Sequence, residues 1–119
     1  MAHAWIHARS SARRFGGRAE DYIAIHDWFD ATKELVADFR HRALRHHTHG
    51  LFEAERRFGH VIINADGRPV PVRVIGEQHL REDFGRIPTP QDWLHAIPFA
   101  QWMQPHPALQ RSLEHDLTA

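Results

Sequence analysis

The sequence predicts an α+β fold: a mainly helical single domain that carries one small β-hairpin. Apolar residues recur at helical spacing in several segments, such as Tyr22, Ile25 and Phe29 at i, i+3 and i+7. Between residues 60 and 74 the pattern changes to two β-branched runs that flank Asp66-Gly67, a typical hairpin sequence. The length of 119 residues and a hydrophobic content of 42% fit one domain with a modest core.

The first two elements are predicted to be helical. Residues 1–17 indicate a short helix or an arm that docks by its aromatic side chains, and Gly16-Gly17 breaks it. Residues 20–29 follow as an amphipathic helix whose apolar side faces the core. His26 lies just beside that apolar face at 100° per residue.

A longer helix is expected from Ala31 to His49. Asp30 or Thr32 can cap its start, and Gly50 suits the position after its end. The helical period places His46 at the end of the inward face and His41 on the opposite, charged side. The stripe expected to face inward consists of Thr32, Leu35, Val36, Phe39, Ala43 and His46.

The remaining helices of the domain are expected to be short. Residues 51–58 form one that stops at Gly59, and residues 77–84 form another that stops at Gly85. The run Thr89-Pro90-Gln91-Asp92 combines an N-cap threonine, a proline at the first helical position and an acid at the third. It therefore predicts the start of a further helix.

The end of the chain is predicted to be a separate tail. Gln104-Pro105-His106-Pro107 is typical of a linker, so residues 1–103 form the single globular domain. Residues 104–119 are then the Pro-containing linker with an amphipathic tail. Its stripe of Leu109, Leu113 and Leu117 either docks on the domain or meets a partner, which can be a second copy of the chain or another protein.

Composition excludes several function classes. The 15 basic and 15 acidic side chains cancel, so no field of the whole molecule attracts nucleic acid. Because the chain has no cysteine, disulfides, thiolate metal sites and cysteine nucleophiles are excluded. Met1–Ser11 has no apolar signal core and no apolar run reaches about 20 residues, so we expect neither a signal peptide nor contact with a membrane. A cytoplasmic location is the expectation.

Twelve histidines make a site the main functional prediction. His26-x3-Asp30 and His79-x3-Asp83 repeat one i,i+4 pairing, which brings the two side chains of each pair together on a helix. Imidazole nitrogen and carboxylate oxygen suit zinc, iron or manganese. The predicted metal ligands of this site are His26, Asp30, His46, His79 and Asp83.

A metal-dependent hydrolase is the leading specific hypothesis. A metal-bound water would be the nucleophile, and the residues predicted to be catalytic are Asp83 and His46. A purely structural interpretation stays open for the same residues. Asp30 can serve only as a cap, His79 and Asp83 can form an exposed pair, and His46 can be a hydrogen-bonded core histidine.

The alternative function is a non-catalytic interaction protein, or one associated with nucleic acid. Residues 40–57 contain five arginines, four histidines and two acids, and arginine binds phosphate in a bidentate manner. Phe52, Phe58 and Trp5 can stack on bases where they are exposed. Because the net charge is zero and these aromatics also fit core stripes, a solvated helix face is favoured over nucleic-acid binding.

Five segments of the chain form a recognisable combination of motifs. They are SSARRFGG (10–17), IHDWFD (25–30), RHRALRHH (40–47), GEQHLRED (76–83) and GRIPTPQDWL (85–94). Together they resemble a family of small uncharacterised, His-rich bacterial and phage proteins. The likeness covers about His7 to Met103, and it supports one intact domain without implying any activity.

Overall fold

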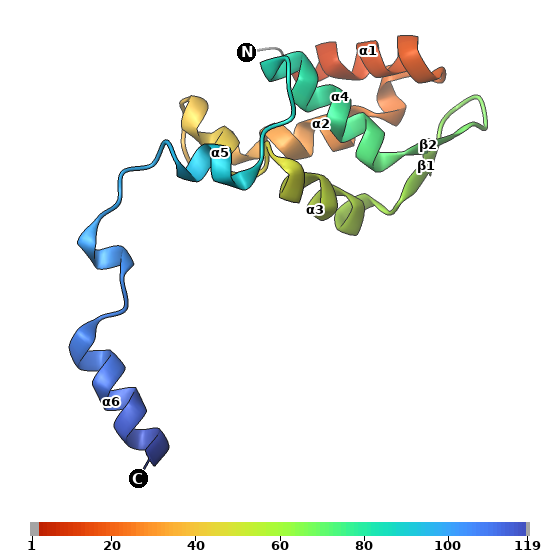
Figure 1. The fold of residues 1–119 in the computed structure, drawn as a ribbon. Coiled ribbons are helices and arrows are strands. Elements are labelled where there is room, and N and C mark those ends of the chain that lie inside the picture. The colour runs from red at the N-terminus through yellow and green to blue at the C-terminus, as the bar shows by residue number, and fades with distance from the viewer. Residues whose placement is uncertain (1–2, 119) are drawn as a thin grey trace.

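A computed structural model describes residues 3–118, and helices dominate it (Figure 1). The α+β class is confirmed, since the described part of the chain adds one two-stranded antiparallel sheet to the helices. Met1, Ala2 and Ala119, which begin the predicted first segment and end the predicted tail, lie outside the described residues. In chain order the elements are α1 (Ala4–Phe15), η1 (Ala19–Asp21), α2 (Ile23–Asp30), η2 (Ala31–Glu34), η3 (Phe39–Leu44), α3 (Thr48–Phe58), β1 (Val61–Ile63), β2 (Pro69–Pro71), α4 (Val72–Phe84), α5 (Pro90–Leu94), η4 (Gln101–Met103) and α6 (Pro107–Thr118), where η marks a 3-10 helix.

Helix α4 occupies the centre of the domain. It packs against α1, α2 and α3, as Figure 1 shows. The predicted inward stripe of α2 is confirmed, because Tyr22, Ile25 and Phe29 are all buried. The hydrophobic core consists of Ala8, Phe15, Tyr22, Ile25, Phe29, Leu51, Ala54, Val70, Val72, Ile75 and Leu80. Any side chain on the inner face of α4 is therefore surrounded by three other helices.

The long helix predicted for residues 31–49 is wrong. The segment forms the two short 3-10 helices η2 and η3, separated by an irregular stretch, and Asp38 caps η3 by accepting a hydrogen bond from the Arg40 backbone N–H. Since the 3.6-residue period is lost, the expected inward stripe does not hold: Leu35 is 75% exposed and Phe39 is 66% exposed. Local capping at Asp38 competes with a continuous helix here.

His41 is correspondingly buried and not on the surface. It is 1% exposed, and its Nδ1 lies 2.8 Å from the Thr32 hydroxyl. The expectation that His41 faces water was derived from a helical register that the segment does not adopt. His46 is fully buried, as predicted, although it lies in the loop that leads into α3 and not in a helix.

Gly50 lies inside α3 and does not end the preceding helix as predicted. A Cβ atom at this position would collide with the backbone carbonyl oxygen of Arg45. The absent side chain thus lets the loop before α3 fold closely over the first turn of that helix. His47 caps the same turn, since its Nδ1 accepts a hydrogen bond from the Gly50 N–H at 3.0 Å.

The predicted hairpin is confirmed. Strands β1 and β2 pair in antiparallel register, with Ile62 opposite Val70. In the turn, Asn64 Oδ1 accepts hydrogen bonds from the backbone N–H groups of Asp66 and Arg68, and Gly67 adopts a φ of 77°. Helix α4 starts directly after β2, earlier than predicted, so only the end of the second β-branched run, residues 72–74, belongs to the first turn of a helix.

The capping box predicted at Thr89 is confirmed. The Thr89 hydroxyl accepts from the Asp92 N–H, and the Asp92 carboxylate accepts from the Thr89 N–H at 2.8 Å. These two hydrogen bonds stabilise the first turn of α5.

The C-terminal segment extends away from the domain (Figure 1). Every side chain described from Gln101 to Leu117 is exposed, including the leucines of α6. In this structure the leucine stripe therefore does not dock on the domain. No helix in the described part of the chain is long and apolar enough to cross a bilayer.

We expect a protein truncated after Met103 to fold as the full chain does. Every described side chain in the removed segment is exposed. The free energy of unfolding should therefore change by less than about 0.5 kcal/mol, as for exposed positions in general. Chemical denaturation of both proteins measures this. Loss of a cooperative transition in the truncated protein would show that the tail is part of the core.

Candidate metal centre

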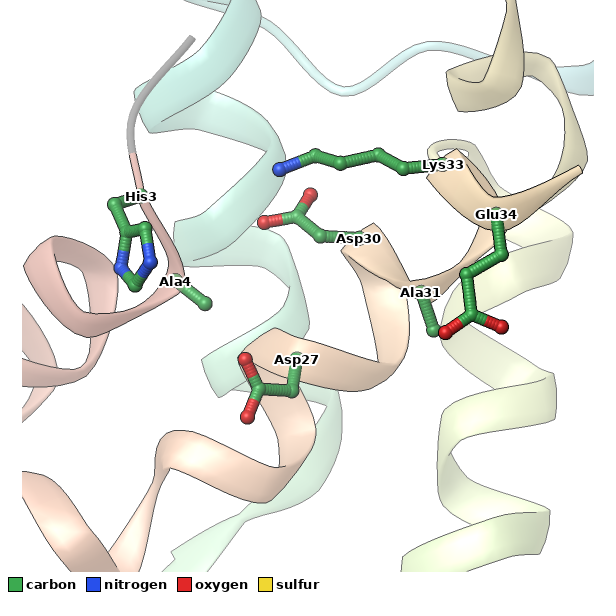
Figure 2. Close-up of a pocket in the computed structure, with 7 residues that line it drawn as sticks. All are labelled: His3, Ala4, Asp27, Asp30, Ala31, Lys33 and Glu34. Atoms are coloured by element: carbon green, nitrogen blue, oxygen red, sulfur yellow. The ribbon is translucent and has the colours of Figure 1, made fainter. Parts of the chain in front are cut away.

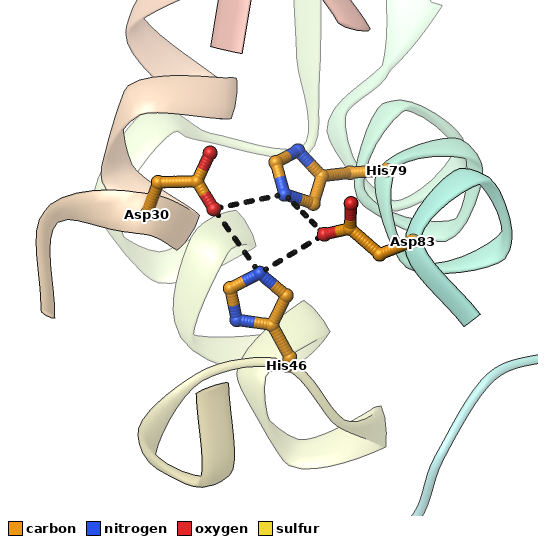
Figure 3. A group of neighbouring side chains, drawn as sticks. All are labelled: Asp30, His46, His79 and Asp83. Carbon is orange, nitrogen blue, oxygen red and sulfur yellow. Dashed lines mark ion pairs between the residues drawn. The ribbon is translucent and has the colours of Figure 1, made fainter. Parts of the chain in front are cut away.

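Four side chains from three segments of the chain meet inside the domain. Asp30 ends α2, His46 precedes α3, and His79 and Asp83 lie one turn apart on α4 (Figure 3). One ligand atom from each residue lies within 4.8 Å of the other three. All four side chains are buried; that of Asp83 is 2% exposed. We call these residues the His/Asp group.

The distances within the His/Asp group resemble those between ligands of one ion. His46 Nε2 lies 3.2 Å from Asp30 Oδ1 and 3.4 Å from Asp83 Oδ2. His79 Nε2 lies 3.3 Å from Asp30 Oδ1 and 3.2 Å from Asp83 Oδ2. Ligands about 2.0–2.1 Å from a tetrahedral zinc ion are separated by about 3.3 Å. The four nitrogen–oxygen separations thus match that geometry.

The same atoms lack hydrogen-bond partners. His46 Nε2, His79 Nε2, Asp30 Oδ1 and Asp83 Oδ2 are all buried, and none makes a directed hydrogen bond. The nitrogen and oxygen atoms lie within ion-pair distance of one another, but they are poorly oriented for hydrogen bonds. Buried polar atoms without partners are rare, and each costs about 1–3 kcal/mol. A cation between them would satisfy all four at once.

The second oxygen of Asp83 is held from behind by two basic side chains. Oδ1 lies 3.2 Å from His7 Nε2 and 3.6 Å from Arg42 Nη2. Arg42 lies over the rings of Phe39 and Phe84, which fixes the guanidinium in place. These contacts turn Oδ2 toward the two imidazoles of the group.

The surroundings favour ionised carboxylates. Burial alone would raise the pKa of Asp83, but the nearby imidazoles of His46, His7 and His79 outweigh it and lower that pKa far below its usual range. The same balance lowers the pKa of Asp30, through His46 and His79. For His7, burial acts to lower the pKa, whereas Asp83 and Glu82 raise it by a larger amount. Two buried negative charges therefore face each other across the group.

The loop that carries His46 is fixed by the segment around α5. The Trp93 indole N–H donates to the His46 carbonyl oxygen at 2.8 Å, and the Thr48 N–H donates to the Pro88 carbonyl at 2.9 Å. The Thr89 capping box stabilises the start of α5, the helix that contains Trp93. The capping box therefore contributes indirectly to the position of His46. A loop residue thereby gains a defined position next to α4.

Four of the five predicted ligands come together, and the fifth lies behind one of them. His26 is fully buried, but its Nδ1 lies 2.9 Å from Nδ1 of His79, on the side of that ring away from the carboxylates. The pair His79 and Asp83 is in contact, as its spacing indicates. Asp30 makes no side-chain cap, so its carboxylate is free for the group.

The residues that support the group were not predicted from the sequence. They include His7 and Ser11 on α1, Arg42 on η3 and Gln78 on α4. The four-residue spacing of His7 and Ser11 puts both on one face of a helix, a signal that was available. That this face packs on α4, however, depends on tertiary structure that no spacing in one segment reveals.

A pocket of about 330 Å³ lies beside Asp30, between the start of α1 and the end of α2 (Figure 2). Figure 2 shows the Lys33 side chain extending over the Asp30 carboxylate, with His3 across from it. The lining residues are His3, Ala4, Asp27, Asp30, Ala31, Lys33 and Glu34. Asp30 belongs to both the pocket and the His/Asp group, and its two carboxylate oxygens are themselves buried.

A comparison with family models identifies a match over residues 2–103, to a domain of unknown function (DUF6915). The chain belongs to this family. Searches of curated proteins and of solved structures give no match. The matched region contains the whole His/Asp group and ends where η4 ends, whereas α6 lies outside it.

We expect Arg42→Met to destabilise the protein by about 1–3 kcal/mol, because it leaves a buried carboxylate oxygen of Asp83 with only one partner. Arg40→Met is the matched control two residues away. The Arg40 side chain is 83% exposed and pairs with Asp38 on the surface, where ion pairs contribute little. Urea denaturation of both variants, read by tryptophan fluorescence, compares them. Equal losses would contradict the role assigned to Arg42.

Proposed function

We propose that this chain is a metal-binding domain whose ion is held by Asp30, His46, His79 and Asp83. The observation that carries the proposal is that four buried ligand atoms, mutually within 4.8 Å, all lack hydrogen-bond partners. A core that merely tolerates polar residues satisfies them with each other. Here the two imidazoles and two carboxylates converge without doing so, which is the arrangement that a cation needs.

Charge balance supports a divalent ion. Two ionised carboxylates are costly inside a protein unless opposite charge lies beside them. One divalent cation neutralises both and leaves His46 and His79 as neutral ligands. Protonation of both imidazoles would also balance the charge, but the contacts of 3.2–3.4 Å are long and misdirected for such hydrogen bonds.

The donor set favours transition metals. Two nitrogen and two oxygen atoms suit zinc, iron or manganese, whereas magnesium and calcium prefer oxygen ligands alone. Zinc is favoured among these, because it takes nitrogen and oxygen ligands and the four nitrogen–oxygen separations of 3.2–3.4 Å suit it.

A metal-dependent hydrolase is the more specific proposal for the same site. An ion in the group would supply Lewis acidity and an activated water. Such chemistry needs an open coordination position, which the pocket beside Asp30 can offer to a water and a substrate. Asp83 Oδ1 is engaged by His7 and Arg42, and His46 Nε2 faces the ion position. A catalytic role for Asp83 or His46 therefore requires that residue to leave the ion during turnover.

Interaction through the tail is a second candidate function, favoured by the apolar stripe of α6. Leu109 and Leu113 are each 63% exposed, and Leu117 is 86% exposed. We propose a second copy of the chain or another protein as the partner. The protein truncated after Met103 tests this: it should lose any self-association that sedimentation shows for the full chain.

We expect the purified, untagged protein to bind one zinc ion per chain and to melt at a higher temperature with zinc than with a chelator. Binding to the folded state alone adds stability by mass action, about 2.7 kcal/mol at a hundredfold excess of ligand over the dissociation constant. Metal analysis gives the stoichiometry, and calorimetry gives the shift. Because His79 supplies a ligand atom, His79→Ala should abolish most of the shift.

His106→Ala is the control, since His106 is an exposed residue of the linker before α6. It should keep the stoichiometry and the melting shift of the original chain. A protein that binds neither zinc, iron nor manganese, or a His79→Ala variant that behaves as His106→Ala does, would contradict the proposal.

A further inference from the structure

His26 connects the metal centre to α1 through a continuous chain of hydrogen bonds. Its Nδ1 lies 2.9 Å from Nδ1 of His79, and its Nε2 lies 2.8 Å from the Ser11 hydroxyl. The Ser11 hydroxyl lies 2.7 Å from Gln78 Oε1. Ser11, His26, Gln78 and His79 are all buried, so solvent does not compete for these contacts.

The Gln78 amide sets the direction of this chain. Its Nε2 donates to the His7 carbonyl and to Glu82 Oε1, so its Oε1 is the end that faces Ser11 and accepts a hydrogen bond. Ser11 has a single hydroxyl proton, and it is used by one of two atoms that can only accept, Gln78 Oε1 or the His7 carbonyl oxygen at 3.1 Å. The Ser11 oxygen is then free to accept a proton donated by His26 Nε2.

The same reasoning fixes the proton on His79. A neutral His26 that carries its proton on Nε2 has a bare Nδ1, which can only accept. His79 Nδ1 must then be the donor of the 2.9 Å contact. A neutral His79 protonated on Nδ1 has a bare Nε2, and Nε2 is the atom that faces Asp30 and Asp83. That is the tautomer that a metal ligand requires.

We propose that Ser11 and His26 are positioning residues that hold His79 in the tautomer whose Nε2 binds the ion. This inference rests on the proposed metal site and adds residues that do not touch the ion. It assigns to His26, predicted from its spacing to be a ligand, the role of hydrogen-bond acceptor behind one.

A neutral acceptor suits the charge of this site. His26 is fully buried, and neither of its hydrogen-bond partners, Ser11 and His79, is a carboxylate, so a neutral imidazole fits this position. The His/Asp group already contains two carboxylates, and those balance one divalent ion. A carboxylate in the place of His26 would add a third negative charge within the same buried region, whereas an imidazole orients His79 without adding any.

Three substitutions separate the hydrogen bond from the packing. In His26→Leu, the volume is largely kept and the acceptor is lost, so zinc affinity should fall by about 10–100-fold. In His26→Asn, the amide oxygen takes the place of Nδ1, and most of the affinity should return. Ser11→Ala should weaken binding by a smaller factor. Ser10→Ala is the matched control, since the Ser10 hydroxyl donates a hydrogen bond to Glu82 and contacts neither His26 nor His79.

Proton magnetic resonance of the cobalt-loaded protein reads the tautomer directly. The Nδ1–H of His79 should give a shifted resonance that exchanges slowly with water in the original chain and in His26→Asn. It should exchange fast in His26→Leu. If His26→Leu does not fold, the His79 Nδ1–H resonance of the original protein and the zinc affinity of Ser11→Ala test the positioning role instead.

The possible failures are distinguishable. A chain that binds no cobalt or zinc overturns the metal site and this inference with it. A chain that binds the ion, but shows no slowly exchanging His79 Nδ1–H or keeps its affinity in both His26→Leu and Ser11→Ala, overturns only the positioning role.

Discussion

The fold depends on how two buried carboxylates are neutralised. Asp30 and Asp83 approach each other in the interior, on α2 and α4, in a region where a charge without a partner costs several kcal/mol. Several of the polar residues in the core are explained by this constraint. His7 and Arg42 hold the far oxygen of Asp83, while His46 and His79 face the near oxygens. Each comes from a different segment, so the site and the tertiary structure stabilise each other.

The central position of α4 follows from the same requirement. Ile75 and Leu80 of this helix are completely buried in the apolar core. One turn further along, His79 and Asp83 face the polar group. A single helix therefore packs both the hydrophobic core and the candidate metal centre. Gly76, on the same helix, allows Phe29 and Leu51 to approach closely, since a Cβ there would lie 3.0 Å from the first and 2.7 Å from the second.

The features that were predicted correctly are those that depend on residues close together in the sequence. The Thr89 capping box, the Asp66-Gly67 hairpin and the stripe of α2 depend on neighbours within a few residues, and all three are confirmed. The i,i+4 pair of His79 and Asp83 belongs to the same class. The helix predicted for residues 31–49 failed because Asp38 caps a new 3-10 helix inside it, which moved His41 to the interior. His7 and Ser11 were missed because their role arises only when α1 packs on α4.

Anomalous X-ray diffraction from crystals grown with zinc would show whether the His/Asp group holds a metal ion. We expect one peak at the zinc absorption edge, about 2.0–2.2 Å from His46 Nε2, His79 Nε2, Asp30 Oδ1 and Asp83 Oδ2. The peak should be absent from crystals of His79→Ala. Zinc bound only at exposed histidines, with direct hydrogen bonds closing the group instead, would contradict the account.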